Sequence, residues 1–379
     1  MDADAPLDGL RVLHLSTVHI VTDPRIRLKE CPTLIEAGAT VRFVGRASAI
    51  EVENGVDVRT LPEYERRFDR VWKGQRDALL ATRQFEPDVI HFHDPELLLI
   101  APLLRRIAPV VIYDVHESLP DLVLDREWIP GWARKAVGRL CGFLEPLFAR
   151  ACSAYVFVDA RWAPRFAERP WIELRNPPLA DEFVPVERSV PPDPPHFVYV
   201  GELLPERGVH SAVRAVTAME TDTRLTLAGP CPPALADELQ ALDTKGRMSL
   251  PGLIDRPTVG DLLANATAGL VLFEPVPAYD GAIATKIHEY LGAGLPLVLS
   301  ETTAHRRIAD ETGAAIVVPY DDIGALRSAM STLTADEGCR TALVAAASEA
   351  AARATTWRDV QSSLIDLYRQ IHQIARTAS

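Results

Sequence analysis

Residues 89–117 read VIHFHDPELLLIAPLLRRIAPVVIYDVHE, and they decide the fold. The stretch holds two short β-branched runs, 89–92 and 110–115, with a helical pattern at 95–107 between them. A strand, a helix and a strand in this order pair in parallel, because the helix carries the chain back across one face of the sheet. We therefore expect a βαβ unit here, with both strands in one sheet.

The same alternation fills the rest of the first half of the chain. Further β-branched runs lie at 11–16, 40–45 and 155–158. Helical patterns separate them, at 24–37, 69–85, 131–150 and 159–167. Because strands and helices alternate throughout, the pattern predicts an α/β, doubly wound parallel sheet.

The stretch 176–196 breaks this alternation. It opens with Asn-Pro-Pro and closes with Pro-Pro-Asp-Pro-Pro-His, and proline removes backbone donors and disfavours helix in the residue before it. We interpret the stretch as a stiff linker between domains; a long surface loop inside one domain is the alternative. The predicted domains are residues 1–180 and 181–356, and a final helical segment, 357–379, is expected to pack back on the N-terminal domain.

After the linker the alternation starts again. Strands are expected at 197–201, 225–228, 269–273, 295–300 and 314–318. Helices are expected at 208–219, 232–243, 257–265, 283–292, 322–333, 336–351 and 357–376. Two open parallel sheets bind ligands beyond the carboxyl ends of their strands, so two such domains that face one another offer one cleft for two substrates.

Composition excludes several classes of protein. Apolar residues make up 47% of the chain and the formal net charge is −12, which is unsuited to binding nucleic acid. The N-terminus lacks the basic start and apolar run of a secretory signal, and no stretch of about 18 uncharged apolar residues occurs. The cysteines are scattered with no CxxC spacing, as in a reducing compartment, so we expect a cytoplasmic protein.

The strongest local motif is ATKIHEYLGAGLPLV at 284–298. It predicts a helix that begins near residue 285, a glycine stop and a buried strand. Lys286 and Glu289 share one face of this helix near its N-terminus, where free backbone donors favour a phosphate. Lys286 would add a positive charge and Glu289 could accept hydrogen bonds from a ribose. A surface ion pair between the two residues is the alternative interpretation.

A second motif is VGELLPERG at 200–208, between the first strand of the second half and a helix. Gly201 and Gly208 would let the backbone approach a ligand, and Arg207 offers two parallel donors to a phosphate. A solvent-facing arginine in an ordinary loop would fit the same pattern.

Polar residues also end two strands of the first half. They are His91-Phe-His-Asp94 and Tyr113-Asp-Val-His-Glu117. His91 and His93 point to one face, and Asp94 is placed to cap the next helix. Two histidines suggest a metal site only weakly, because no third and fourth ligand is spaced for it. His116 with Glu117 is the better candidate for contact with a sugar, the alternative being an imidazole satisfied within its loop.

Taken together, these motifs resemble the family 4 retaining glycosyltransferases of the GT-B fold, in the bacterial branch that acts on surface polysaccharides and similar products. The resemblance begins with DPRIRLKE at 23–30 and LIEAGATV at 34–41, continues through both histidine motifs, and ends with the 286–296 block. It implies two Rossmann-like domains facing across a cleft. The N-terminal domain would bind the acceptor and the C-terminal domain a nucleotide sugar.

The resemblance also implies roles for individual residues. His116, Arg207 and Lys286 would be catalytic, with His116 on the sugar and the two cations on the diphosphate. The donor would be bound by Gly201, Arg207, Gly252, Ile254, Gly281, Ala282, Lys286 and Glu289. The sugar and acceptor side would hold Asp23, Arg25, His93, Asp94, His116 and Glu117.

Two departures from the family pattern concern charged residues. Relatives often carry a base directly after the glycine of the first strand, where this chain has Glu202, and an acid where it has Gly281. Backbone amides of the loop 279–284 would take the place of that acid. Both departures bear on the catalytic geometry and on whether the protein is active.

The expected reaction is transfer of a hexose-type sugar from UDP or GDP to a hydroxyl acceptor, which would be a glycan, a lipid-linked molecule or a small molecule. The resemblance implies retention by front-side attack, with fixed cations taking the place of a metal, so that no cofactor is required. A non-catalytic donor-binding partner subunit and a non-hydrolysing nucleotide-sugar epimerase are the alternatives. The missing acid at Gly281 weighs against the epimerase.

One segment suggests a membrane partner. Residues 128–143 mix aromatic side chains with Arg134, Lys135 and Arg139, as in helices that lie on the anionic inner face of a membrane. A domain helix with one wet face is the alternative, and the pattern favours it.

Overall fold

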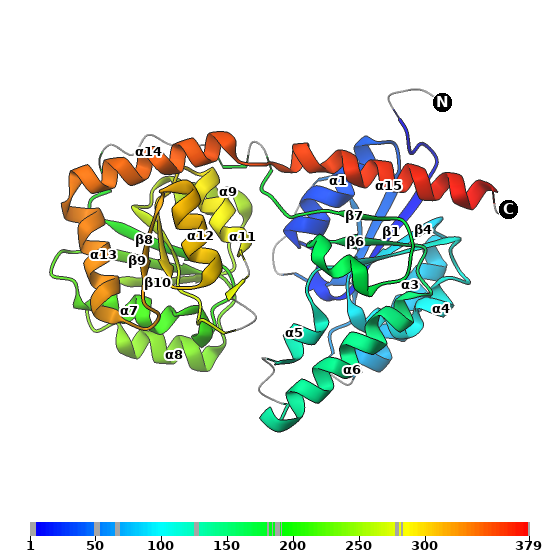
Figure 1. Ribbon diagram of the computed structural model, residues 1–379, viewed down its shortest axis with the longest axis horizontal. Coiled ribbons are helices and arrows are strands. Elements are labelled where there is room, and N and C mark those ends of the chain that lie inside the picture. Colours follow the sequence, from blue (N-terminus) through cyan, green and yellow to red (C-terminus); the bar gives the residue numbers. More distant parts are fainter. Residues whose placement is uncertain are drawn as a thin grey trace. The chain divides into compact units, whose positions relative to one another are not determined.

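The structure is a computed structural model, and it describes residues 5–48, 54–64, 69–124, 129–179, 182–183, 185, 190, 192–276, 280–281 and 283–377. The chain divides into two compact units (Figure 1). Unit 1 comprises Met1–Asn176 and Trp357–Ser379, and unit 2 comprises Pro177–Thr356. The change of unit after Asn176 falls at the start of the proline-rich stretch.

Unit 1 is built on a seven-stranded parallel sheet in the order β3-β2-β1-β4-β5-β6-β7. Its strands are β1 (Arg11–Ile20), β2 (Thr40–Arg46), β3 (Asp57–Leu61), β4 (Val89–Phe92), β5 (Val110–Val115), β6 (Ala154–Phe157) and β7 (Trp171–Glu173). The central strands β4, β5 and β6 are buried at every residue, as both-side coverage of a parallel sheet requires.

Helices cover both faces of this sheet. They are α1 (Cys31–Glu36), α3 (Gln75–Phe85), α4 (Ala101–Leu104), α5 (Leu119–Leu124), α6 (Gly131–Ala149) and α15 (Trp357–Thr377). Single turns of 3₁₀ or π-helix precede or connect them at Ile26–Glu30, Arg70–Gly74, Pro95–Ile100 and Ala160–Arg165. The last helix, α15, lies beside α1 in Figure 1, and the Trp357 indole donates to the Thr33 hydroxyl at 2.8 Å.

Unit 2 repeats the plan with six parallel strands in the order β10-β9-β8-β11-β12-β13. Its strands are β8 (His196–Val200), β9 (Arg224–Ala228), β10 (Met248–Gly252), β11 (Ala268–Val271), β12 (Leu297–Ser300) and β13 (Ala315–Val318). Its helices are α7 (Val209–Ala218), α8 (Pro233–Leu242), α9 (Arg256–Ala264), α11 (Thr285–Gly292), α12 (Thr303–Thr312), α13 (Ile323–Ala335) and α14 (Glu337–Arg353). Two apolar clusters, around Phe197 and around Tyr290, fill the space between sheet and helices.

The predicted α/β class with two doubly wound sheets is confirmed, but the sequence pattern missed five elements. Three are the edge or near-edge strands β3, β7 and β10, whose residues are largely half-buried or exposed and therefore form no apolar run. The others are two short helices, α5 and α12. The predicted helix 95–107 is also wrong in detail, because it is a 3₁₀ segment followed by a single α-turn.

Candidate active site

Each sheet has one topological switch point, where the strand order reverses. In unit 1 it lies between β1 and β4, and in unit 2 between β8 and β11. Loops that leave such neighbouring strands in opposite directions open a crevice at their carboxyl ends, which is the usual ligand site of this architecture. The candidate residues of each unit are best described around its own switch point.

In unit 1 four imidazoles form a stack at the switch point. His14 of β1 pairs in register with His91 of β4, and their ring centroids are 4.7 Å apart. His91 and His93 stack at 4.8 Å, and His93 meets His116 edge to face at 5.2 Å. The alternation of β4 side chains explains why His91 and His93 share a face, as predicted.

Hydrogen bonds link these rings from the surface inward. His116 Nε2 lies 3.1 Å from His93 Nδ1, and His93 Nε2 lies 3.0 Å from His14 Nδ1. The His91 ring instead contacts the Tyr368 hydroxyl of α15 at 2.9 Å. Burial holds the pKa of His14, His91 and His93 well below the ordinary value, so these three rings are neutral near pH 7.

Beneath the imidazoles lies a buried ion-pair cluster. The Arg25 guanidinium donates to both carboxylate oxygens of Asp114, at 3.2 and 3.0 Å, and lies 2.8 Å from Glu30. A π-helical turn at Ile26–Glu30 joins residues five apart, which turns Arg25 and Glu30 to the same side. Arg25 was expected on the sugar-facing surface, but it is 4% exposed and faces inward.

The charges in this cluster compensate one another. Burial would raise the pKa of Asp114, but Arg25 and His116 outweigh it and hold that pKa well below its usual range. For Glu30 burial prevails over Arg25 and raises the pKa well above its usual range. Asp114 is therefore the ionised carboxylate of the pair. One of its oxygens lies 3.2 Å from His116 Nε2.

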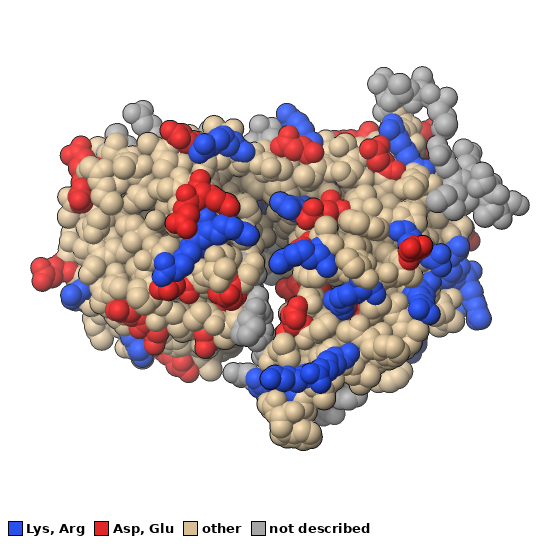
Figure 2. Space-filling model, in the orientation of Figure 1, with Lys and Arg blue, Asp and Glu red and all other residues tan. Residues whose placement is uncertain are grey.

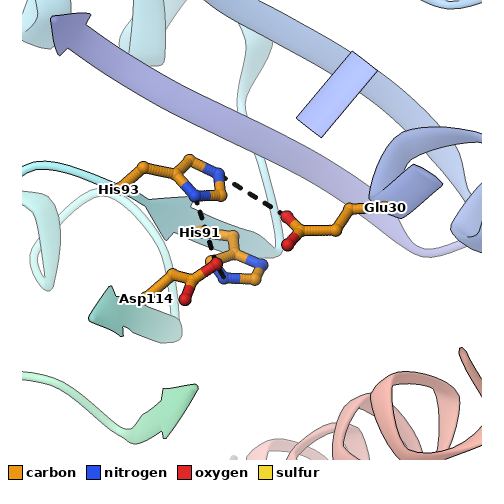
Figure 3. Close-up of side chains that lie close together, drawn as sticks. All are labelled: Glu30, His91, His93 and Asp114. Atoms are coloured by element: carbon orange, nitrogen blue, oxygen red, sulfur yellow. Dashed lines mark ion pairs between the residues drawn. The ribbon is translucent and has the colours of Figure 1, made fainter. Parts of the chain in front are cut away.

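The fold also brings together four residues that could hold a metal ion, namely Glu30, His91, His93 and Asp114 (Figure 3). Their ligand atoms lie within 4.8 Å of one another. The sequence spacing offered no third or fourth ligand, whereas the fold supplies Glu30 and Asp114 from other elements. Arg25 places a positive charge against both carboxylates, 2.8 Å from Glu30 and 3.0 Å from Asp114.

Asp94 has a different role from the predicted helix cap. Its carboxylate accepts hydrogen bonds from the Ser16 hydroxyl at 2.9 Å and from the Thr17 backbone amide at 2.6 Å. No side-chain cap forms on the following helical turn. Asp94 therefore holds the carboxyl-terminal part of β1 against the end of β4, across the switch point.

Above these buried groups lie the accessible ones: His19, Asp23, His116 and Glu117. Sequence reasoning missed His19, which is 25% exposed; its ring lies 4.9 Å from that of His116, and its Nδ1 lies 2.9 Å from Asp23. Burial works against protonation of His19, but Asp23 and two other carboxylates raise its pKa to about 9. His19 lies in the last part of β1, just beyond the apolar run predicted at 11–16, and that position was the signal that could have found it.

In unit 2 two cations meet at the switch point. The Lys286 ammonium lies 3.5 Å from the centroid of the Tyr199 ring, and the Arg207 guanidinium lies 4.4 Å from that of Phe273. The Lys286 ammonium is also 5.7 Å from the Phe273 ring, so Phe273 contacts both cations. The helix α11 that carries Lys286 has no side-chain cap at Ala284, and the Ile287 amide of its first turn donates to the Ala284 carbonyl at 2.9 Å.

Two glycines give the cations this position. A Cβ added at Gly201 would lie 2.7 Å from the Lys286 ammonium, and one at Gly208 would lie against the Leu272 carbonyl. Both have positive φ, of 136° and 68°. The room that Gly201 leaves is thus used by Lys286, and Gly208 lets the turn that carries Arg207 pack on β11.

Glu289 is not paired with Lys286. Its carboxylate accepts from Arg256 at 2.9 Å, and Arg256 also bridges to Glu182. The predicted alternative of a surface ion pair between Lys286 and Glu289 is therefore wrong. Arg256 is the residue that sequence reasoning overlooked here, although it lies two residues after Ile254, which was predicted to bind the donor.

The remaining predicted donor residues lie on loops. Gly252 ends β10 and accepts from the Gly229 amide at 2.8 Å, and Ile254 follows it, half-buried. Gly281 is exposed, and Ala282 lies outside the described residues. Next to them, Asp280 accepts from the Thr303 amide and hydroxyl, which ties this loop to the start of α12.

Comparison with protein families places the two units in one enzyme class. The profile described as Glycosyltransferase Family 4 matches residues 30–171, and the profile described as Glycosyl transferases group 1 matches residues 194–336. The chain belongs to the family 4 glycosyltransferases with the GT-B fold. No curated protein matches the sequence significantly.

Solved structures with the same fold are distant in sequence from this glycosyltransferase. Sucrose-phosphate synthase from Thermosynechococcus elongatus superposes with a TM-score of 0.73 at 16% identity, covering 96% of this chain and 100% of that one. WaaG, a glycosyltransferase involved in lipopolysaccharide biosynthesis, superposes with a TM-score of 0.68 at 14% sequence identity. The match covers 94% of this chain and 99% of WaaG. Anabaena HepE in complex with UDP and glucose superposes with a TM-score of 0.68 at 12% sequence identity. The match covers 96% of this chain and 100% of HepE.

Two further findings concern the setting of the enzyme. Across the described residues, no helix is both long and apolar enough to cross a bilayer. All five cysteines lie in the described part of the chain, and each is a free thiol.

Proposed function

We propose that this glycosyltransferase moves a hexose-type sugar from a nucleoside diphosphate, UDP or GDP, to a hydroxyl acceptor with retention of configuration. The observation that carries the proposal is the meeting of Arg207 and Lys286 at the switch point of unit 2. Two cations that share one aromatic ring at the uncapped start of a helix suit a diphosphate. Complexes of HepE with UDP-glucose, and of an E. coli trehalose-6-phosphate protein with UDP-2-fluoro glucose, support a nucleotide sugar as donor.

The chemistry follows from the charges that develop. The bond between the anomeric carbon and the diphosphate breaks, which leaves negative charge on the leaving oxygen. Arg207, Lys286 and the first amides of α11 stabilise that charge, which is the largest catalytic term in many transferases. The acceptor hydroxyl attacks from the same face, and its proton passes to the departing diphosphate.

Unit 1 would act on the sugar. His116 is half-buried at the end of β5, and Asp114 and His93 hold its Nε2 from behind. Its other nitrogen is then directed away from the buried cluster and suits a sugar hydroxyl. Glu289 would accept from the ribose, and the loop at Gly252 and Ile254 would read the base.

We propose that the reaction requires no metal, because fixed cations already serve the diphosphate. A chelator should then leave the rate of transfer unchanged. Free thiols also favour a reducing compartment, so we propose that the enzyme is cytoplasmic.

The test begins with thermal shifts against UDP, GDP, dTDP and ADP. A bound nucleotide at a hundred-fold excess over its Kd stabilises the protein by about 2.7 kcal/mol. The glucose conjugate of the best binder is then incubated with and without a sugar acceptor, and the anomeric products are read by NMR. Transfer or slow hydrolysis with retention is the expected result.

Other outcomes would point to the alternative functions. An epimerised donor formed without an acceptor would indicate an epimerase. Tight donor binding with neither transfer nor hydrolysis would indicate a partner subunit without activity. Inversion at the anomeric carbon would contradict the front-side mechanism.

We also propose that unit 1 contacts an anionic membrane through α6 and takes a lipid-linked acceptor there. Trp132 is 88% exposed and Phe143 is 67% exposed on this helix. Lys and Arg side chains gather over the same helix in Figure 2. Flotation with anionic but not neutral vesicles, lost in the double variant Trp132→Ala and Phe143→Ala, would support the contact, whereas no flotation would exclude it.

A further inference from the structure

Lys286 is held in an unusual way for a lysine inside a protein. Among the described residues no carboxylate lies within ion-pair distance of its ammonium, and its neighbour Glu289 is bound to Arg256 instead. The face of the Tyr199 ring takes that place, with its centroid 3.5 Å from Nζ. Tyr199 itself is 2% exposed and fixed in β8, and its hydroxyl donates to the Glu202 carbonyl at 2.8 Å.

The charged surroundings of Lys286 are mixed. Arg207 faces it from the turn before α7, Glu289 lies on its own helix, and Glu202 follows β8. Burial lowers the pKa of Lys286 well below the ordinary value, and Arg207 lowers it further, while Glu289 and Glu202 oppose the shift. The ammonium therefore holds its proton weakly until another anion approaches.

We propose that Tyr199 is a positioning residue that holds Lys286 at the carboxyl end of β8 without neutralising it, so that an arriving diphosphate supplies the counter-charge and is bound together with a proton. This inference rests on the proposed function and deepens it. A carboxylate in the place of the ring would keep the lysine protonated and would compete with the diphosphate. A ring face attracts a cation without competing for the phosphate oxygens.

The test is titration calorimetry with UDP at pH 8, repeated in two buffers of different ionisation enthalpy. At this pH the terminal phosphate of UDP, with a pKa near 6, is already ionised, so any proton taken up goes to the protein. Wild type is expected to take up protons when it binds UDP, and Lys286→Met close to none. Equal uptake by the two proteins would overturn the proposal.

Two substitutions at Tyr199 separate the ring from its hydroxyl. Tyr199→Phe keeps the ring face and should bind UDP within about twofold of wild type, whereas Tyr199→Leu should bind about 3- to 30-fold more weakly. If Phe weakens binding as much as Leu, the ring is not the positioning group and the proposal fails. The comparison of wild type with Lys286→Met decides the issue even if Tyr199→Leu does not fold.

The proposed function and this inference fail in different ways. If wild type binds none of UDP, GDP and ADP, both fail. If wild type binds UDP with no net proton uptake, the donor site stands and only the coupling to Lys286 is overturned.

Discussion

The two units have the same central strand order and the same switch point, but they treat charge there in opposite ways. In unit 1 Arg25 is paired with Asp114 and Glu30, and neutral imidazoles cover the cluster. In unit 2 Lys286 lies over a ring, with no carboxylate in the described residues close enough to pair with it. One fold thus carries a site whose arginine is paired with carboxylates and a site whose lysine, in the described part of the chain, has a ring face instead of a carboxylate beside it.

The difference indicates what each unit can recognise. A balanced polar surface, ending in His116 and His19, offers hydrogen bonds without net attraction for an anion, which suits the hydroxyls of a sugar. Cations held by aromatic rings retain their attraction for a diphosphate. The division into a sugar side and a phosphate side that we propose would follow from how the charges are held.

The largest effect is expected at the buried pair of unit 1. Arg25→Met leaves Asp114 and Glu30 without their cation, and losing one partner of a buried pair costs about 3–5 kcal/mol. All six tryptophans belong to unit 1, so urea unfolding followed by tryptophan fluorescence reports on this unit alone. In the control Arg42→Met, an arginine paired with the half-exposed Asp57 is removed, at a cost of about 1 kcal/mol or less.

A cost for Arg25→Met no larger than that of its control would show that unit 1 does not depend on a closed charge network. The contrast between the two switch points would then disappear.

The second effect is on rate. Arg207→Ala removes a donor to the leaving group and should lower kcat for transfer by about 10²–10³. Arg214→Ala, at an exposed position of α7, is the matched control and should retain full activity. Near wild-type turnover in both Arg207→Ala and Lys286→Ala would refute the phosphate assignment.

The third effect is a pH dependence of stability in unit 1. The pKa of His19 is raised to about 9, so its stabilising contribution is complete below pH 6.5 and is lost as pH rises through 9. The unfolding free energy of wild type relative to His19→Gln should fall by roughly 1–3 kcal/mol between pH 6.5 and 9.5. His210→Gln, which removes a histidine of unit 2, is the control and should leave the unfolding free energy of unit 1 unchanged. A constant difference would mean that His19 is not held as a cation.

Apolar runs and their alternation predicted the class of fold, because central parallel strands such as β4 and β5 are buried on both faces and leave that mark on the sequence. The edge strands β3, β7 and β10, whose residues are largely half-buried or exposed, leave no such mark. The polar strand ends at His91–Asp94 and Asp114–Glu117 indicated a site. They did not indicate which of its side chains are buried and which are accessible. Whether Arg25 faces a ligand or Asp114 depends on a π-helical turn and on a strand 89 residues away, which no local pattern encodes.

The same limit applied in unit 2, where the pattern offered Lys286 as the partner of Glu289 and the fold supplied Arg256, 33 residues earlier in the chain. Arg256 forms a fixed bridge between Glu289 and Glu182. Burial alone would lower the pKa of Arg256, but the two carboxylates outweigh burial and raise it. Arg256→Lys keeps the charge and loses the planar fork that holds both carboxylates.

The smallest effect is expected from this substitution. Because Glu289 would bind the ribose equally in the ground and transition states, Arg256→Lys should raise the donor KM by about three- to tenfold with kcat within about twofold. Arg306→Lys, in an exposed pair with Glu301, is the control and should change neither constant. A fall in kcat with an unchanged KM would instead assign Arg256 to the transition state, and unit 2 would then resemble unit 1 in using a preformed ion pair for its chemistry.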